Sequence, residues 1–200
     1  DIPILSEESS YIPFNERSKW KKYWLIDPLD GTKEFIKKNG EFTTNIALII
    51  NHSPVFGIIH APAINETYWG SEMGGCYFLQ GKSPLDKVRL RTSNNKDKIR
   101  IISSRSHPSG DLKKLLEKLD CFEILGIGSS LKFCLIAKGE ADCYPRLGPT
   151  SEWDTAAGEI IAKSAGAEVI DITGQSIKYN YKDSFLNPHF IVTNNDKIKS

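Results

Sequence analysis

Two carboxylates stand three residues apart in the segment 24–35, which reads Trp-Leu-Ile-Asp-Pro-Leu-Asp-Gly-Thr-Lys-Glu-Phe. Asp27 and Asp30 follow a short apolar run; the proline between them fixes the backbone, and Gly31 permits a sharp turn. Such a turn can aim both carboxylates and an intervening backbone carbonyl at one point, which is the oxygen set that Mg²⁺ prefers. The amides of Gly31 and Thr32, at the start of a predicted short helix, are suited to hold a phosphate group.

Three further acidic residues, in two segments, are less informative by themselves. Asp154 lies in the segment 153–158, Trp-Asp-Thr-Ala-Ala-Gly, at the predicted N-cap of a helix, and an aspartate there is most often only a cap. Glu7 and Glu8 form an acidic pair after an apolar strand, which alone is typical of a solvated turn. None of these three residues would predict a metal site without Asp27 and Asp30.

The elements that must position these residues follow from hydrophobic periodicity and turn signals. Residues 11–23 are polar and are predicted to form a surface loop, and the remaining lysines and arginines are taken as solvated. The predicted strands cover residues 23–26, 43–50, 55–60, 66–72, 75–79, 100–103, 169–172 and 190–193. The predicted helices cover residues 108–119, 130–138 and 155–165. This mixture predicts an α+β protein of layered helices and mixed sheets.

Composition narrows the class of protein. Apolar residues make up 40% of the 200 residues and charged residues 26%, which predicts a globular protein with a sizeable core. A net charge of +1 argues against a partner that is a nucleic acid polymer. No apolar run approaches the roughly 20 residues that a transmembrane helix needs. The four cysteines lack the spacing of a zinc site, so reduced thiols in the cytoplasm are expected.

The segments 27–32 and 153–158 resemble the two signature segments of the lithium-sensitive, Mg²⁺-dependent phosphatases of the inositol-monophosphatase superfamily. The resemblance runs from Ile4 to Val192 and implies that superfamily's layered α/β sandwich. It also implies hydrolysis of a phosphate monoester by metal-activated water, without a covalent phosphoenzyme. A cluster of roughly two or three Mg²⁺ ions and inhibition by Li⁺ are expected on the same ground.

The resemblance also implies roles for individual residues. Glu7 and Thr32 are expected to orient and activate the attacking water. Gly31 and Thr32 are expected to hold the phosphate, and Asp154 to contact the substrate as well as a metal ion. The implied metal ligands are Glu7, Asp27, the carbonyl of Leu29, Asp30 and Asp154.

Three other segments, 103–107, 128–134 and 144–150, resemble the 3′(2′),5′-bisphosphate nucleotidase branch. Inositol phosphatases carry an acidic residue near the position of Arg146, where this chain has a cation. Lys132 and Arg146 would suit the second phosphate of 3′(2′)-phosphoadenosine 5′-phosphate, which is held while the other is cleaved to leave AMP. Ser130, Ser106 and His107 complete the implied substrate contacts, although His107 reads equally well as an ordinary loop histidine.

Relatives in this superfamily carry a largely helical segment before the position of Asp1, and the resemblance implies that this segment supplies an aspartate that pairs with Thr32. We expect two lobes, residues 1–105 with the metal-binding turn and residues 106–200 with the nucleotide site. Two alternatives stay open: an inositol-phosphate phosphatase, and a truncated nucleotide-binding form with little activity. The expected partner is a small nucleotide; a homodimer, and a location in the cytoplasm or peripheral to the inner membrane, also remain open.

Overall fold

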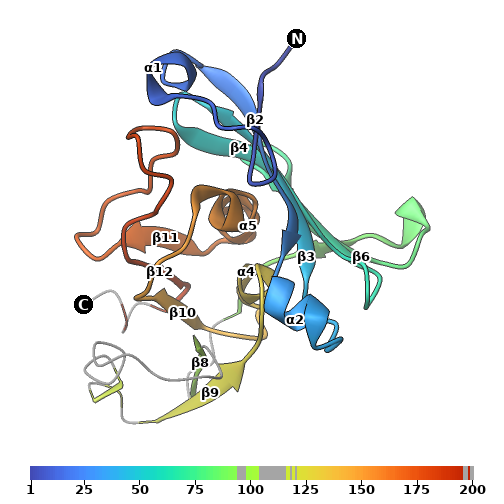
Figure 1. The fold of residues 1–200 in the computed structure, drawn as a ribbon. Coiled ribbons are helices and arrows are strands. Elements are labelled where there is room, and N and C mark those ends of the chain that lie inside the picture. The colour runs from blue at the N-terminus through green and yellow to red at the C-terminus, as the bar shows by residue number, and fades with distance from the viewer. Residues whose placement is uncertain (94–97, 104–115, 118, 120, 196–197, 199–200) are drawn as a thin grey trace.

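The first half of the chain builds one large sheet. The computed structural model describes residues 1–93, 98–103, 116–117, 119, 121–195 and 198 (Figure 1). Seven strands pair in sequence order, and only β1 runs parallel to its neighbour β2. They are β1 (Ile4–Ser6), β2 (Lys22–Asp30), β3 (Thr43–Ile50), β4 (Ser53–Ala61), β5 (Glu66–Ser71), β6 (Gly75–Gln80) and β7 (Val88–Leu90).

The second sheet is mixed, with strand order β11-β12-β10-β8-β9. β8 is parallel to both β9 and β10, whereas β12 is antiparallel to β10 and β11. The strands are β8 (Ile99–Ser103), β9 (Phe122–Gly126), β10 (Cys143–Arg146), β11 (Glu168–Asp171) and β12 (Phe190–Thr193).

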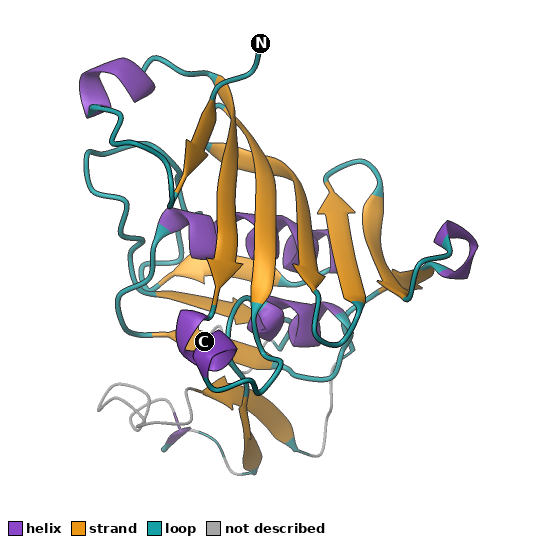
Figure 2. Cartoon of the chain, turned by 45° about the vertical axis from the view of Figure 1, so that its right-hand side comes forward, coloured by secondary structure: helices purple, strands orange, loops and turns teal. Residues whose placement is uncertain are grey.

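Helices α4 (Leu131–Ala137) and α5 (Glu152–Ala165) join the two sheets (Figure 2). α5 packs along the first sheet, and α4 packs between α5 and the strands β10 and β12. The shorter pieces are α1 (Phe14–Arg17), α2 (Thr32–Ile36) and the 3-10 turn η1 (Pro84–Asp86). No helix in the described ranges is long and apolar enough to cross a membrane. The two sheets, with α4 and α5 packed between them, confirm the expected α+β sandwich with mixed sheets.

A glycine lets α5 lie directly on the first sheet. A Cβ atom on Gly57 in β4 would stand 2.7 Å from the carbonyl oxygen of Ala157 and 2.6 Å from Cγ2 of Ile160. Side chains on the same face of the sheet, such as Leu25 and Ile59, are buried in the main core. The alternate residues on the opposite face, such as Trp24, are half-buried.

Most predicted strands are confirmed within a residue or two, including the hairpin between β3 and β4 and the C-terminal strands, and so are helix α4 and the end of α5. The predicted turn at 51–54 is shorter, because Asn51 and His52 alone take positive φ and β4 begins at Ser53. β7, β9 and β10 were not predicted. The predicted helix at 108–119 lies almost entirely outside the described residues. The lobe boundary at residues 105 and 106 stays a prediction, although β8, which precedes it, pairs in the second sheet.

Three expectations were wrong in ways that bear on the site. β2 does not end before Asp27 but continues past the proline to Asp30. Its pairing with β3 shifts register between Asp27 and Asp30, where the proline lies. α5 begins at Glu152, so Asp154 is its third residue and Ser151 is the N-cap. The polar stretch 11–23 is not a solvated loop, because it contains α1 and the fully buried Arg17.

The contact between Gly57 and α5 generates a stability prediction. Gly57→Ala forces a methyl group against backbone atoms of α5, so we expect a loss of about 1–3 kcal/mol in the free energy of unfolding. Thermal melting followed by circular dichroism measures this loss. Gly148→Ala is the matched control, because a Cβ there meets nothing within 4 Å. Equal melting temperatures for the two variants would contradict the close contact.

Candidate metal centre and substrate cavity

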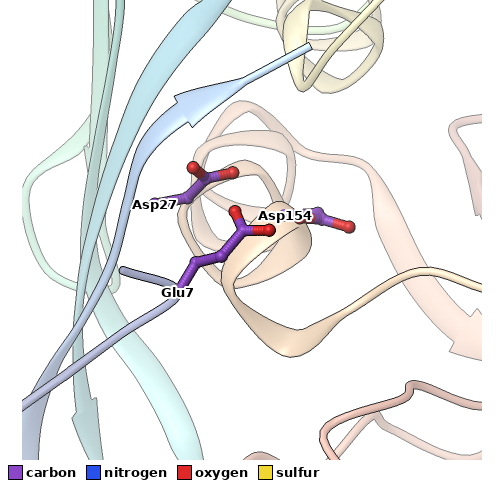
Figure 3. Close-up of side chains that lie close together, drawn as sticks. All are labelled: Glu7, Asp27 and Asp154. Atoms are coloured by element: carbon purple, nitrogen blue, oxygen red, sulfur yellow. The ribbon is translucent and has the colours of Figure 1, made fainter. Parts of the chain in front are cut away.

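Three carboxylates from three elements meet at the junction of β1, β2 and α5. Glu7, Asp27 and Asp154 each offer an oxygen atom within 4.8 Å of the others (Figure 3). Parallel pairing sets Ser6 of β1 beside Ile26 of β2, and the Glu7 amide donates to the Ile26 carbonyl at 3.2 Å. Glu7 therefore emerges next to Asp27, and we call these three residues the carboxylate cluster.

Asp154 joins the cluster because its position in the first turn of α5 is fixed locally. Its Oδ2 accepts hydrogen bonds from the Ser151 amide at 2.9 Å and from Thr150 Oγ1 at 2.8 Å. With Ser151 this forms a capping box, so Asp154 does cap the helix even though it is not the N-cap residue. The capping interpretation and the metal interpretation are thus compatible at this residue.

In the part of the chain that the structure describes, no positive charge offsets the carboxylates of Glu7 and Asp27. Burial, together with the nearby charges of Asp30, Glu7 and Asp154, raises the pKa of Asp27 to about 8. Burial, followed by the charge of Asp154, also raises the pKa of Glu7. Asp27 Oδ1 accepts the Leu29 amide at 2.9 Å, but the buried Oδ2 has no hydrogen-bond partner among the residues that the structure describes. An unpartnered buried oxygen inside a group of carboxylates fits a hard divalent cation.

Asp30 is not one of the three carboxylates of the cluster, although its charge acts on Asp27. Its Oδ2 accepts the Ser130 amide at 2.5 Å, with the Thr43 hydroxyl 3.5 Å away. Burial and then Asp154 raise the pKa of Asp30 to about 6, whereas Lys132 lowers it. The backbone amide at the start of α4 therefore already binds an anionic group, the Asp30 carboxylate. The roles of Asp30 and of the Leu29 carbonyl as metal ligands stay predictions.

The turn after β2 has the predicted backbone. Gly31 adopts left-handed φ (87°), and a Cβ atom there would be 3.0 Å from the carbonyl oxygen of Glu41. Thr32 is the first residue of α2 and its side chain is exposed. Both stay candidates for holding the phosphate, and the conformation shows why a residue with a Cβ does not suit position 31.

A polar cavity of about 350 Å³ opens beside this turn. Of the predicted substrate contacts, it brings together Gly31, Ser130, Lys132, Arg146 and Asp154. Ser106 and His107 lie outside the described residues, so their assignment stays a prediction. The cavity thus joins the turn after β2 to α4, to the end of β10 and to the start of α5.

The two cations of the cavity differ in their surroundings. Lys132 Nζ donates to the Ser129 carbonyl at 2.9 Å and lies 5.8 Å from the centre of the Tyr144 ring. Burial lowers the pKa of Lys132, opposed by the Asp30 charge. Arg146 is half-buried, and one of its terminal nitrogens donates to the Pro149 carbonyl.

Glu41 is a cavity residue to which sequence reasoning gave no role. Its Oε2 accepts the amide hydrogen of Gly128 at 2.7 Å, which ties the segment after α2 to the segment before α4. Glu34 packs against the same glycine, where a Cβ would stand 2.6 Å from Glu34 Cγ. Nothing local in the sequence indicates this contact, because the two residues are 87 positions apart.

The fold and the site belong to a known class of protein. The inositol monophosphatase family matches residues 1–199, and the chain belongs to that family. Within it, the chain is similar to the 3′(2′),5′-bisphosphate nucleotidase CysQ of Salmonella typhimurium, with 47% identity over 96% of this chain and 76% of that protein. CysQ of Escherichia coli K12 is 46% identical with the same coverage.

Solved structures give the same result. The crystal structure of CysQ from Bacteroides thetaiotaomicron superimposes with a TM-score of 0.88 and 41% identity, covering 96% of this chain and 76% of that chain. The inositol monophosphatase of Thermotoga maritima gives a TM-score of 0.73 at 27% identity, over 100% of this chain and 73% of that one.

The raised pKa of Asp27 predicts proton-linked Mg²⁺ binding. Below its pKa of about 8 the metal-free carboxyl is mostly protonated, so a bound cation must displace that proton. We expect the association constant for Mg²⁺ to rise about tenfold per pH unit between roughly pH 6 and 8. Titration calorimetry in buffers of different ionisation enthalpy measures the released proton. A Mg²⁺ affinity that is the same at both ends of this range would contradict the prediction.

The same shift predicts a stability change without metal. The pKa of Asp27 lies above its ordinary value of 3.8, so the folded state loses stability relative to the unfolded chain, which ionises first, as pH rises from about 4 to 8. Asp27→Asn keeps an acceptor for the Leu29 amide and removes the charge. We expect it to raise the melting temperature of the metal-free protein by a few degrees at pH 8 and by less at pH 5. The opposite ordering of the two pH values would refute this sign.

Proposed function

We propose that this protein is a Mg²⁺-dependent phosphomonoesterase that hydrolyses 3′(2′)-phosphoadenosine 5′-phosphate to AMP and phosphate. The observation that carries this proposal is the carboxylate cluster at the edge of a cavity that also contains Lys132 and Arg146. The names of the relatives support the same substrate class, because they are 3′(2′),5′-bisphosphate nucleotidases.

Glu7, Asp27 and Asp154 would hold the metal, with the Leu29 carbonyl and Asp30 as further ligands. Bound Mg²⁺ supplies Lewis-acid chemistry, since it offsets phosphate charge and makes water more acidic. Roughly two or three ions are proposed for a site with this many oxygen ligands, and Li⁺ is proposed as an inhibitor.

The chain's own groups would position the reactants. Glu7 is the exposed member of the carboxylate cluster, so its carboxylate can orient a water molecule and accept its proton, with the Thr32 hydroxyl assisting. The amides of Gly31 and Thr32 would hold the phosphate that is cleaved. Asp154 lines the cavity as well as the cluster, so it lies where metal and substrate would meet.

The cavity suits a substrate with two separated anionic groups. Arg146 can grip the second phosphate through its planar fork, and Lys132 adds a charge-assisted hydrogen bond. Ser130, Ser106 and His107 complete the proposed contacts with the nucleotide. An inositol monophosphate has no second phosphate, so these two cations would have no partner in it.

We propose further that residues 1–105 form the metal-binding lobe and residues 106–200 the nucleotide-binding lobe. Asp30 at the end of β2 and Asp154 in the first turn of α5 both line the cavity, so this division would place the cavity between the two lobes. A homodimer, and a place in the cytoplasm or at the inner membrane surface, are proposals that sedimentation and cell fractionation would test.

Phosphate release from 3′-phosphoadenosine 5′-phosphate and from inositol 1-phosphate, each with Mg²⁺, tests the proposed function. We expect release from the nucleotide, abolished in Asp27→Asn. Arg146→Met should raise KM for the nucleotide about tenfold, the usual loss for one charge-assisted pair. Arg91→Met is the matched control, because Arg91 is exposed and is not among the residues that line the cavity.

Two outcomes of this assay would count against the proposal. Release mainly from inositol 1-phosphate would refute the roles of Lys132 and Arg146 while keeping the metal chemistry. Release from neither substrate would refute the phosphatase assignment.

A further inference from the structure

Arg17 is a fully buried cation that the proposed chemistry does not use. Its guanidinium lies between two aromatic rings, 4.9 Å from the centre of Phe14 and 4.1 Å from that of Phe185. It donates hydrogen bonds to Asn180 Oδ1 at 2.5 Å, to the Lys182 carbonyl at 3.3 Å and to the Asp183 carbonyl. Burying a charged group this completely is costly unless its partners are fixed.

These bonds fix the segment 180–187, which in turn holds the start of α5. The Asn180 amide donates to Glu152 Oε2 at 2.7 Å, and the Glu152 amide donates to the Phe185 carbonyl at 2.9 Å. Asn187 Nδ2 donates to the Ser151 carbonyl at 2.9 Å. The first turn of α5 is therefore bonded to segment 180–187 at both Ser151 and Glu152, directly before Asp154.

Arg17 itself belongs to the other side of the carboxylate cluster. It ends α1, which lies between β1, followed by Glu7, and β2, which contains Asp27. The Arg17 carbonyl also accepts a hydrogen bond from Asn180 Nδ2 at 2.6 Å, so backbone and side chain contact the same residue. Arg17 thus connects the stretch that carries Glu7 and Asp27 to the one that carries Asp154.

We propose that Arg17 is a positioning residue for the metal centre, holding Asp154 in register with Glu7 and Asp27 through segment 180–187. This inference rests on the metal site proposed above. Asp154 reaches the carboxylate cluster only if the start of α5 keeps its place, and described bonds at that start lead back to Arg17 in two steps. Supporting contacts of this kind set how well first ligands bind a metal.

The charges around Arg17 explain why an arginine stands there. Glu152 is buried, and Arg17 and Lys182 partly offset the rise in its pKa that burial causes. Burial and the charge of Glu152 raise the pKa of Tyr23, and the charge of Arg17 lowers it. Arg17 also forms an ion pair at 3.5 Å with Asp183, whose side chain is largely exposed. A planar guanidinium can lie over aromatic rings while its donors reach separated acceptors, whereas an ammonium group is a compact point charge that cannot stack in this way.

Mg²⁺ binding, measured by titration calorimetry on the full chain, tests this role apart from activity. We expect Arg17→Met to weaken Mg²⁺ binding at least about tenfold and Arg17→Lys to weaken it less. Hydrogen exchange of segment 180–187 should be faster in Arg17→Met. In nucleotide hydrolysis by Arg17→Met, the Mg²⁺ concentration that gives half-maximal activity should rise by a larger factor than KM for the nucleotide.

Asp142→Asn is the matched control for lost stability. Asp142 is fully buried in the second sheet and is bonded to the Arg100 guanidinium at 2.8 Å, so this variant should melt earlier without changing Mg²⁺ affinity. Mg²⁺ affinities in Arg17→Met and Arg17→Lys equal to that of the unmodified protein would overturn the inference and leave the proposed function standing. A loss in Asp142→Asn as large as in Arg17→Met would also overturn it.

If Arg17→Met shows no cooperative melting, Arg17→Lys decides, and its unchanged Mg²⁺ affinity overturns the inference. If the unmodified protein binds no Mg²⁺, the proposed function fails and the positioning role fails with it.

Discussion

Helix α5 lies against the first sheet at a separation that only a residue without a Cβ permits at Gly57, and the metal site depends on this contact. The sheet carries Asp27, and its edge strand β1 leads to Glu7, whereas Asp154 comes from the first turn of α5. The three carboxylates can meet only if the helix approaches the sheet closely and at one register. Packing between an interior helix and a sheet therefore determines the geometry of an electrostatic site.

Without a bound cation, these carboxylates lower the stability of the folded protein. Desolvation and mutual repulsion raise the pKa values of Asp27 and Glu7, because the protein gathers acidic groups where a stable core would have none. Binding of a divalent ion to the folded state alone would reverse this cost and stabilise the chain by mass action. Arg17 fits this view as the buried cation that fixes the surrounding framework without neutralising the cluster, since its bonds go to segment 180–187.

The sequence predicted what depends on neighbouring residues and missed what depends on distant ones. The hairpins and the helices α4 and α5 follow from periodicity and turns, and the signature segments indicated Asp27 and Asp154 through family resemblance. The burial of Arg17 could not be predicted, because its partner Asn180 is 163 residues away and the flanking sequence is polar. The sequence predicted that the helix begins at residue 155, which made Asp154 its N-cap. In the structure Ser151 is the N-cap, and it forms a reciprocal pair of hydrogen bonds with Asp154.

Asp30 connects the carboxylate cluster to the cations of the cavity. Its carboxylate lies under the electrostatic influence of Asp154 on one side and of Lys132 on the other, and it accepts the amide of Ser130. Ser130 Oγ is in turn bonded to Asn45 Oδ1 and to the Thr43 hydroxyl, both at 2.7 Å, in a strand of the first sheet. A shift of α4 that moved the cation Lys132 would therefore also disturb Asp30 beside the metal ligands. Because the half-buried Asp30 carboxylate interacts with both, the cations that would hold the second phosphate are kept at a fixed place relative to the proposed metal centre.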